Sequence, residues 1–296
     1  MAGNLIYLRR RIKSVKNTQK LTRAMKTVAA AKLRRATAEL KKTRPHRDKI
    51  AFLLQQSGSR VDLSRQPLLK TREQGSILLV IIASDKGLCG AFNSQVLKQS
   101  ENYCRELLER GEAVSLVTIG TKASRYFSKH NLALKTTHNG MISRLQFADA
   151  SRLAATLLHV YRNEDIKRVE FVFQKFMSVS RQQFTVRQLF PLEMEWSAGA
   201  GSEKESEAER TGYIFEPGAQ AIFEALLPRF ITDTVYQMLL QSMAAEQISR
   251  MVAMDLATRN ASDMIRSLTL LLNKMRQASI TKELLEIITA TEALNK

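Results

Sequence analysis

The sequence predicts a mixed α and β fold (α+β or α/β) in which the two chain ends form a long antiparallel coiled coil and the middle forms an α/β domain. Both ends are long stretches of helix-forming residues with very little glycine or proline. Each end has one apolar stripe, and the middle alternates short apolar runs with helical stretches. We expect coiled-coil helices at 1–60 and 218–296, and an α/β domain at 73–195.

The N-terminal helix is expected to run from Leu5 to about Gln56. This stretch contains no glycine and a single proline, Pro45. Apolar residues recur at steps of three and four, and after a slip of phase a second stripe continues, which is typical of a coiled coil with an irregular register. The two stripes are Leu5, Leu8, Ile12 and Val15, and then Leu21, Met25, Val28 and Ala29, with polar groups at Thr18, Gln19 and Thr22.

Within the C-terminal helix, Pro228 can lie in a first turn, because the first turn of a helix does not need the N–H that proline lacks. No glycine or further proline follows before about Ala293, which gives roughly 95 Å of helix. Neither long helix is stable alone in water, so antiparallel pairing of the two is the simplest arrangement. The expected heptad seam comprises Ala261, Met264, Leu268, Leu271, Met275 and Ala278.

The middle of the chain has a different pattern. Continuous apolar runs predict strands beginning at Ser76, Ala113, Arg168 and Gln183, and helical stretches separate some of them at 95–110 and 148–162. This alternation predicts an α/β sheet that is at least partly parallel. The stretch 197–212 is small and acidic without apolar anchors, and we expect a disordered surface loop there.

The positive charge is concentrated in the first 50 residues. The chain has a formal net charge of +18, and this segment contains 16 Lys and Arg against two acids, a net charge of +14. Such a stripe faces an acidic partner, nucleic acid, an anionic membrane or solvent. The composition is also typical of a mitochondrial transit peptide, but the helical pattern continues unbroken beyond the segment. Tyr7 is its only aromatic residue, so base stacking is poorly provided, whereas phosphate contact stays open.

The stretch "SDKGLCGAFNS" follows the first strand and raises the question of a phosphate-binding loop. It fits neither the dinucleotide fingerprint nor the Walker pattern, so we expect a tight strand-to-helix turn. Asp85 is a candidate catalytic carboxylate or a turn residue, and Cys89 has no evident base. Cys89 and Cys104 are interpreted as reduced thiols, and the four histidines form no metal motif. We expect no catalytic residue, no cofactor site and no metal site.

Several segments, in order along the chain, resemble the gamma subunit of F-type ATP synthases. They are "IKSVKNTQKLTRAMKTVAAAKLRRA", "SDKGLCGAFNS", "YIFEP", "AEQISRMVAMDLATRNASDMI" and "NKMRQASITKELLEII". The resemblance implies a rotor shaft whose terminal helices enter a hexamer of alpha and beta subunits. It also implies a Rossmann-like central domain that binds no nucleotide and lies beside the epsilon subunit and the c-ring. The implied place is peripheral, on the cytoplasmic side of a bacterial inner membrane.

The resemblance also implies partner contacts with the alpha/beta hexamer. Lys26, Lys32, Arg34 and Arg35 match the basic helix that faces an acidic segment of the beta subunits, and Met25 matches a position facing the same segment. Near the far end, Arg276 and Gln277 match a pair that hydrogen-bonds a loop of one beta subunit. The chain departs from the family at "ITATEALNK", where Thr289 and Glu292 replace a small, apolar ending.

Two other classes of function remain as alternatives. The first is a basic coiled-coil protein that binds nucleic acid, which salt-sensitive DNA binding without affinity for an alpha/beta hexamer would favour. The second is a small-molecule enzyme that uses the loop from Ser84 to Asn93, which saturable nucleotide binding by the isolated chain would favour.

Overall fold

The computed structural model describes residues 2–62, 66–130, 132–178, 181–193 and 215–294. The predicted loop at 197–212 lies outside the described residues. The chain divides into two compact units, one formed by Met1–Ala31 with Arg250–Lys296 and the other by Lys32–Ser249. The two longest helices, α1 (Ala2–Gly58) and α5 (Ala219–Leu294), contribute to both units.

Both predicted long helices are confirmed, and each contains a proline in its interior, Pro45 in α1 and Pro228 in α5. The placement of Pro228 in a first turn is wrong, because the helix starts at Ala219 and the proline lies in its interior. Its earlier turns are held by packing, since Phe223 and Leu227 are buried in the core of the second unit. Tertiary packing therefore stabilises the turns before the proline more than the proline disfavours them.

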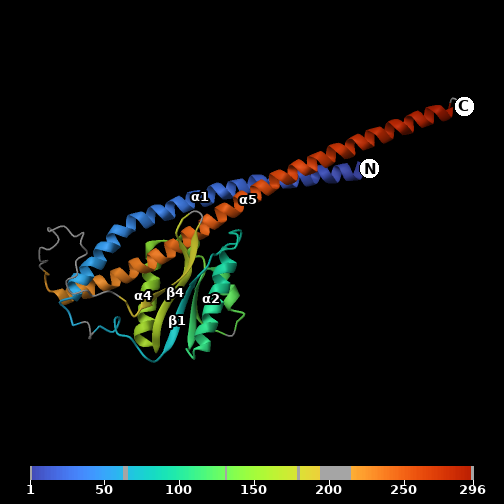
Figure 1. Ribbon diagram of the computed structural model, residues 1–296. Helices are drawn as coiled ribbons and strands as arrows, with labels where there is room; N and C mark the ends of the chain where they lie inside the picture. The colour runs from blue at the N-terminus through green and yellow to red at the C-terminus, as the bar shows by residue number, and fades with distance from the viewer. Residues whose placement is uncertain (1, 63–65, 131, 179–180, 194–214, 295–296) are drawn as a thin grey trace. The chain divides into compact units, whose positions relative to one another are not determined.

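In the first unit, the N-terminal part of α1 lies beside α5 in antiparallel orientation (Figure 1). The expected slip of phase in α1 is wrong, because one regular seam continues through the polar residues, and Leu21 and Val28 are 61% and 56% exposed. The buried or half-buried seam positions are Leu5, Leu8, Ile12, Val15, Gln19, Thr22, Lys26 and Ala29. The seam thus alternates steps of three and four without interruption.

The seam of α5 agrees with the prediction at every second position. Ala261, Leu268 and Met275 lie in it. The expected positions Met264 and Leu271 are wrong, because each is 45% exposed, and Ala278 is exposed as well. The seam positions that replace them are Ile265, Leu272 and Ser279.

The second unit contains one five-stranded sheet with the strand order β3-β2-β1-β4-β5. The strands are β1 (Ser76–Ile82), β2 (Val114–Ile119), β3 (Ala133–His138), β4 (Ile166–Phe176) and β5 (Gln182–Phe190). Strand β1 pairs in parallel with β2 and β4, and β2 pairs in parallel with β3, whereas β5 is antiparallel to β4. The predicted partly parallel sheet is confirmed. Strand β3 was not predicted, because this largely exposed edge strand has no continuous apolar run.

Helices cover both faces of the sheet. They are α2 (Phe92–Glu109), α3 (Thr121–Phe127) and α4 (Phe147–Asn163), with a short 3₁₀ turn at Ile142–Arg144. Alternate residues of the buried strand β1 enter two separate cores. One core packs α4 and parts of α1 and α5 against the sheet, and the other packs α2 and α3 (Figure 1).

Candidate functional site

The candidate functional site of the first unit is the helix pair itself. Most of the cations that α1 contributes to it lie at positions that do not pack against α5. The seam positions of α1 face α5, whereas seven cations of the same segment lie at other positions and are exposed. These exposed cations are Arg9, Arg10, Arg11, Lys13, Lys16, Lys20 and Arg23. Clustered like charges of this kind produce a positive potential that attracts an acidic partner over a range set by the ionic strength.

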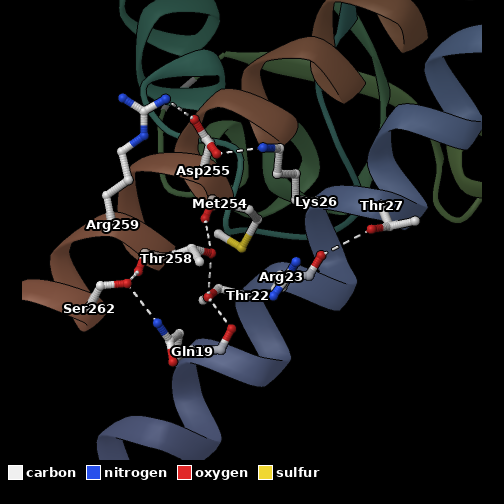
Figure 2. Close-up of polar contacts among 10 residues, drawn as sticks. All are labelled: Gln19, Thr22, Arg23, Lys26, Thr27, Met254, Asp255, Thr258, Arg259 and Ser262. Carbon is white, nitrogen blue, oxygen red and sulfur yellow. Dashed lines mark hydrogen bonds and ion pairs between the residues drawn. The ribbon is translucent and has the colours of Figure 1, made fainter. Parts of the chain in front are cut away.

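Three polar contacts join the two helices at the point where the seam becomes polar (Figure 2). Gln19 Nε2 donates to Ser262 Oγ at 2.6 Å, and one turn later the hydroxyls of Thr22 and Thr258 lie 2.8 Å apart. One further turn along, Lys26 Nζ donates to Asp255 Oδ1 at 2.6 Å. Polar seam groups that find partners specify one register, because a shifted register would leave them unpaired.

The charged contact at Asp255 has a second cation. Arg259 Nη2 donates to Asp255 Oδ2 at 2.8 Å, so both carboxylate oxygens are bonded (Figure 2). The hydrogen bond from Lys26 is the main cause that holds the pKa of Asp255 below its ordinary value, and the charge of Arg259 adds to it against the opposing effect of desolvation. The carboxylate therefore stays ionised and keeps the two helices linked at neutral pH.

The predicted partner contacts are divided between the two units of the chain. In the first unit, Met25 is half-buried, and Lys26 is engaged with Asp255 while its side chain stays 44% exposed. Arg276 and Gln277 are exposed on α5, and neither side chain forms a hydrogen bond to another described residue. In the second unit, three exposed cations follow on α1, namely Lys32, Arg34 and Arg35. Their contacts with a hexamer remain predictions.

The C-terminal end of α5 has no partner helix within the described residues. The register set by Thr22 and Thr258 places the start of α1 near Ser279, and α5 continues beyond it to Leu294 (Figure 1). Residues 280–291 are all exposed. Five of them are large and apolar, with exposed fractions of 50% to 61%: Ile280, Leu284, Leu285, Ile287 and Ile288. An uncovered apolar helix of this kind indicates a surface that another chain covers.

The ending "ITATEALNK" is compatible with this helix, and the hydroxyl group of Thr289 has a hydrogen-bond partner there. Thr289 Oγ1 donates to the backbone oxygen of Leu285 at 2.8 Å, so the hydroxyl is satisfied by its own helix. The side chain of Glu292 lies outside the described residues.

The loop after β1 is folded on its own polar groups, which supports the interpretation as a turn. The carboxylate of Asp85 accepts hydrogen bonds from the backbone N–H groups of Thr121, Gly140 and Ser143, at 3.2, 2.8 and 3.1 Å. It therefore ties three segments together and has a structural role. Ser84 Oγ donates to Asn93 Oδ1 at 2.8 Å, which closes the turn from its first residue to its last.

Both cysteines are buried, and neither is part of a disulfide bond. Cys89 accepts a hydrogen bond from Asn93 Nδ2 at 3.1 Å. Burial, with the nearby charge of Glu101, raises the pKa of Cys104 to about 12, so that thiol stays protonated and unreactive at neutral pH. Within the described ranges, no group of three metal-ligating side chains is found. Nor is any helix among them apolar enough over a sufficient length to cross a membrane.

The sequence missed the α5 partners of the polar seam, namely Asp255, Thr258 and Ser262. A signal was available, because these residues repeat in the opposite helix the three- and four-residue steps of Gln19, Thr22 and Lys26. Polar residues at seam spacing in both helices predict polar layers once the antiparallel register is known.

The fold and the site define a class of helical stalk subunit. In this class, one chain contains an α/β domain and a helix pair with a polar, register-specific seam, and one helix of the pair continues as an uncovered apolar end. The ATP synthase family matches residues 4–294. The ATP synthase gamma chain of Geobacter sp. (strain M21) is 39% identical over 292 residues, covering 99% of each chain. That of Pelotomaculum thermopropionicum is 38% identical over 287 residues, covering 97% of this chain and 98% of its own. The chain therefore belongs to the ATP synthase gamma-chain family, the central-stalk subunits of these complexes.

Solved structures agree with this assignment. A chain from the central stalk and c-ring structure of Tetrahymena thermophila mitochondrial ATP synthase is 26% identical, with a TM-score of 0.59, and the match covers 80% of this chain and 99% of that one. A chain of the Euglena gracilis mitochondrial ATP synthase has a TM-score of 0.65 and covers 99% of this chain and 95% of its own. At 20% identity, the second match supports the fold alone.

Proposed function

We propose that this chain is the central rotor shaft of an F-type ATP synthase. It transmits torque between the ion-driven c-ring in the membrane and the catalytic hexamer of alpha and beta subunits, so that rotation drives ATP synthesis, or hydrolysis drives rotation in reverse. The observation that carries this proposal is similarity to gamma chains over nearly the whole length, at 39% and 38% identity for two of them. The chain has no active site of its own and acts as a subunit of an enzyme complex.

The helix pair of the first unit has the physical properties that a shaft needs. Its exposed cations attract an acidic sleeve without a strongly directional contact, so no single angle is a deep energy minimum. Its polar layers resist sliding of one helix along the other, so torque applied to one helix reaches both. The bare end of α5 supplies apolar surface for the hexamer to cover.

Angle sensing then depends on contacts that form in only one rotational state. Arg276 has a planar guanidinium that suits a carboxylate of one beta subunit, and Gln277 beside it adds an amide. Such a differential contact biases one catalytic site at a time. The epsilon subunit and the c-ring are the partners that we infer for the α/β domain, at the cytoplasmic face of a bacterial inner membrane.

The test is co-expression of this chain with the alpha and beta chains of its own complex. We expect stoichiometric co-purification and ATP-driven rotation of a bead attached to this chain. Loss of apolar surface in a Leu284→Asp/Ile288→Asp variant should weaken assembly, whereas Lys98→Gln, an exposed change on α2, should not. An ATPase-active hexamer that forms without this chain and never retains it would overturn the proposal. The nucleic-acid-binding alternative rests on charge alone, which the shaft explains equally.

A further inference from the structure

A basic groove lies in the second unit, between α1, the β4–β5 hairpin and α5. Its volume is about 390 Å³, within the range of small-ligand sites. Five cationic side chains line it, and two glutamines, Gln237 and Gln241, complete the wall on α5. The cations are Lys41, Arg44 and Arg47 from α1, and Lys175 and Arg187 from the hairpin.

The two strand cations occupy positions where the sheet would otherwise continue its apolar face. Phe171 and Phe173 of β4 are buried in the core that packs against α1 and α5, and Lys175 is the next residue on that face. Arg187 of β5 pairs in register with Phe171, so it shares the same face. Both cations therefore face the side of the sheet on which α1 and α5 pack, and the groove wall formed by α1 is itself basic.

The charges of this groove are not balanced within the described residues. Arg44 and Arg47 share one carboxylate, Asp48, at 3.6 and 2.7 Å. Arg47 Nη1 also donates to Gln237 Oε1 at 2.5 Å, which holds its guanidinium in place. No described side chain forms an ion pair with Lys41, Lys175 or Arg187. Loss of solvent, together with the charge of Arg47, lowers the pKa of Arg187, as expected where like charges meet without a counter-ion.

We propose that this groove binds a small polyphosphate anion, that is, two or more linked phosphoryl groups. Guanidinium groups match phosphate oxygens in bidentate geometry, and a multiply charged chain contacts cations from both walls at once. Lys41, Arg44 and Arg47 are three residues apart, so they lie along one face of α1 and track such a chain. Inorganic pyrophosphate and the diphosphate of ADP share this chemistry. The inference is independent of the rotor function, because it concerns binding by the chain itself.

The test is calorimetric titration of the full-length chain with pyrophosphate, ADP and inorganic phosphate at physiological ionic strength. We expect saturable one-site binding of pyrophosphate and ADP, and weaker binding of single phosphate. A Lys175→Gln/Arg187→Gln variant should bind at least about tenfold more weakly, because it removes two of the five cations that line the groove. The matched control, Lys98→Gln/Lys129→Gln, removes two exposed charges of the same unit and should bind like the wild type.

The arms of the experiment separate the possible ligands. Equal affinities for pyrophosphate and ADP assign recognition to the phosphates alone, and tighter ADP binding adds a contact to the nucleoside. A second variant on the exposed helix surface, Lys41→Gln/Arg44→Gln, repeats the test if the strand variant fails to fold. Absence of saturable binding, or equal loss in the control, overturns the proposal. So does binding of a glutamate-rich peptide by a chain that ignores pyrophosphate.

Discussion

At the residue scale, Lys26 forms an ion pair with Asp255 inside the chain, although the resemblance to the gamma family predicts that it also contacts a partner. The resemblance to the gamma family marks Lys26 as a hexamer contact, and the structure gives its ammonium an ion pair in the seam at 2.6 Å. Because Asp255 also binds Arg259, its carboxylate stays ionised even while Lys26 exchanges with another acid. An acidic partner could therefore form an ion pair with Lys26 in place of Asp255, and Asp255 would stay ionised and paired with Arg259.

The ion pair predicts a pH dependence of stability. The pKa of Asp255 in the folded chain lies below its ordinary value of 3.8, so the pair stabilises the fold above that value and this contribution is lost as the pH falls through the folded-state pKa. We expect Asp255→Asn to lower the melting temperature at pH 7, and we expect this difference to shrink as the pH falls below 3.8, in melts followed by circular dichroism. Glu286→Gln breaks an exposed pair with Lys282 and should change little over the same pH range. A pH-independent difference would contradict this account.

Gly120 supplies a second prediction at this scale. Its φ is +95°, and a Cβ there would lie 2.2 Å from the backbone oxygen of Ala83 at the end of β1. Gly120→Ala should therefore destabilise the chain by about 2–4 kcal/mol, because both strain and a backbone clash must be relieved. Gly111→Ala is the matched control, since Gly111 has a φ of +78° with open space around it and should cost only about 1 kcal/mol. Urea denaturation measures both, and equal losses would exclude the clash.

At the element scale, the apolar pattern of the sequence predicted the long helices and four of the strands. It did not predict all positions of the seam between the two long helices. Periodicity identified Leu5, Leu8, Ile12 and Val15 correctly because their partners in the seam are also apolar. It failed at Leu21 and Val28 because the seam there is polar, and only the pairing of Thr22 with Thr258 shows why. Long-range contacts between opposite ends of a chain are not encoded in local periodicity. The basic groove was missed for the same reason, since its walls are far apart in sequence.

The polar layer of Thr22 and Thr258 favours specificity over stability. Each hydroxyl has one proton and also donates to its own helix, Thr22 to the oxygen of Gln19 at 3.0 Å and Thr258 to that of Met254 at 2.7 Å. The two hydroxyls have two protons in total for three contacts, so the hydrogen bond between the helices forms only in place of one of the intrahelical bonds, and its net contribution is small.

Replacing both hydroxyls with methyl groups should therefore strengthen the helix pair. We expect Thr22→Val/Thr258→Val to raise the free energy of unfolding by about 1 kcal/mol, because valine has nearly the shape of threonine and buries one more apolar group. Thermal melts should shift upward by roughly 2–4 °C. Thr27→Val, at an exposed position of the same helix, is the control and should shift little. A destabilised double variant would mean that the hydroxyl pair contributes more than its geometry indicates.

At the scale of the whole molecule, the residues that form the cores are largely distinct from the surfaces that we propose for binding partners. The cores of the second unit are made by the sheet and its helices, whereas residues 280–291 at the end of α5 are all exposed. Ending the chain after Ser279 should thus leave the free energy of unfolding within about 0.5 kcal/mol of the wild type, as for other surface changes. Comparison of urea midpoints checks this, and a large loss would show that the bare helix stabilises its own chain.

The last prediction concerns Arg276, which is exposed and without a hydrogen bond to another described residue. If its guanidinium senses shaft angle by binding a beta-subunit carboxylate in one rotational state, Arg276→Ala removes a contact that couples rotation to catalysis. A coupling free energy of about 1–2 kcal/mol corresponds to roughly 5- to 30-fold slower ATP synthesis in inverted membrane vesicles, with assembly unchanged. Arg266→Ala removes an equally exposed charge from the same helix and should leave synthesis near normal. Normal synthesis by a fully assembled Arg276→Ala complex would remove this contact from the mechanism.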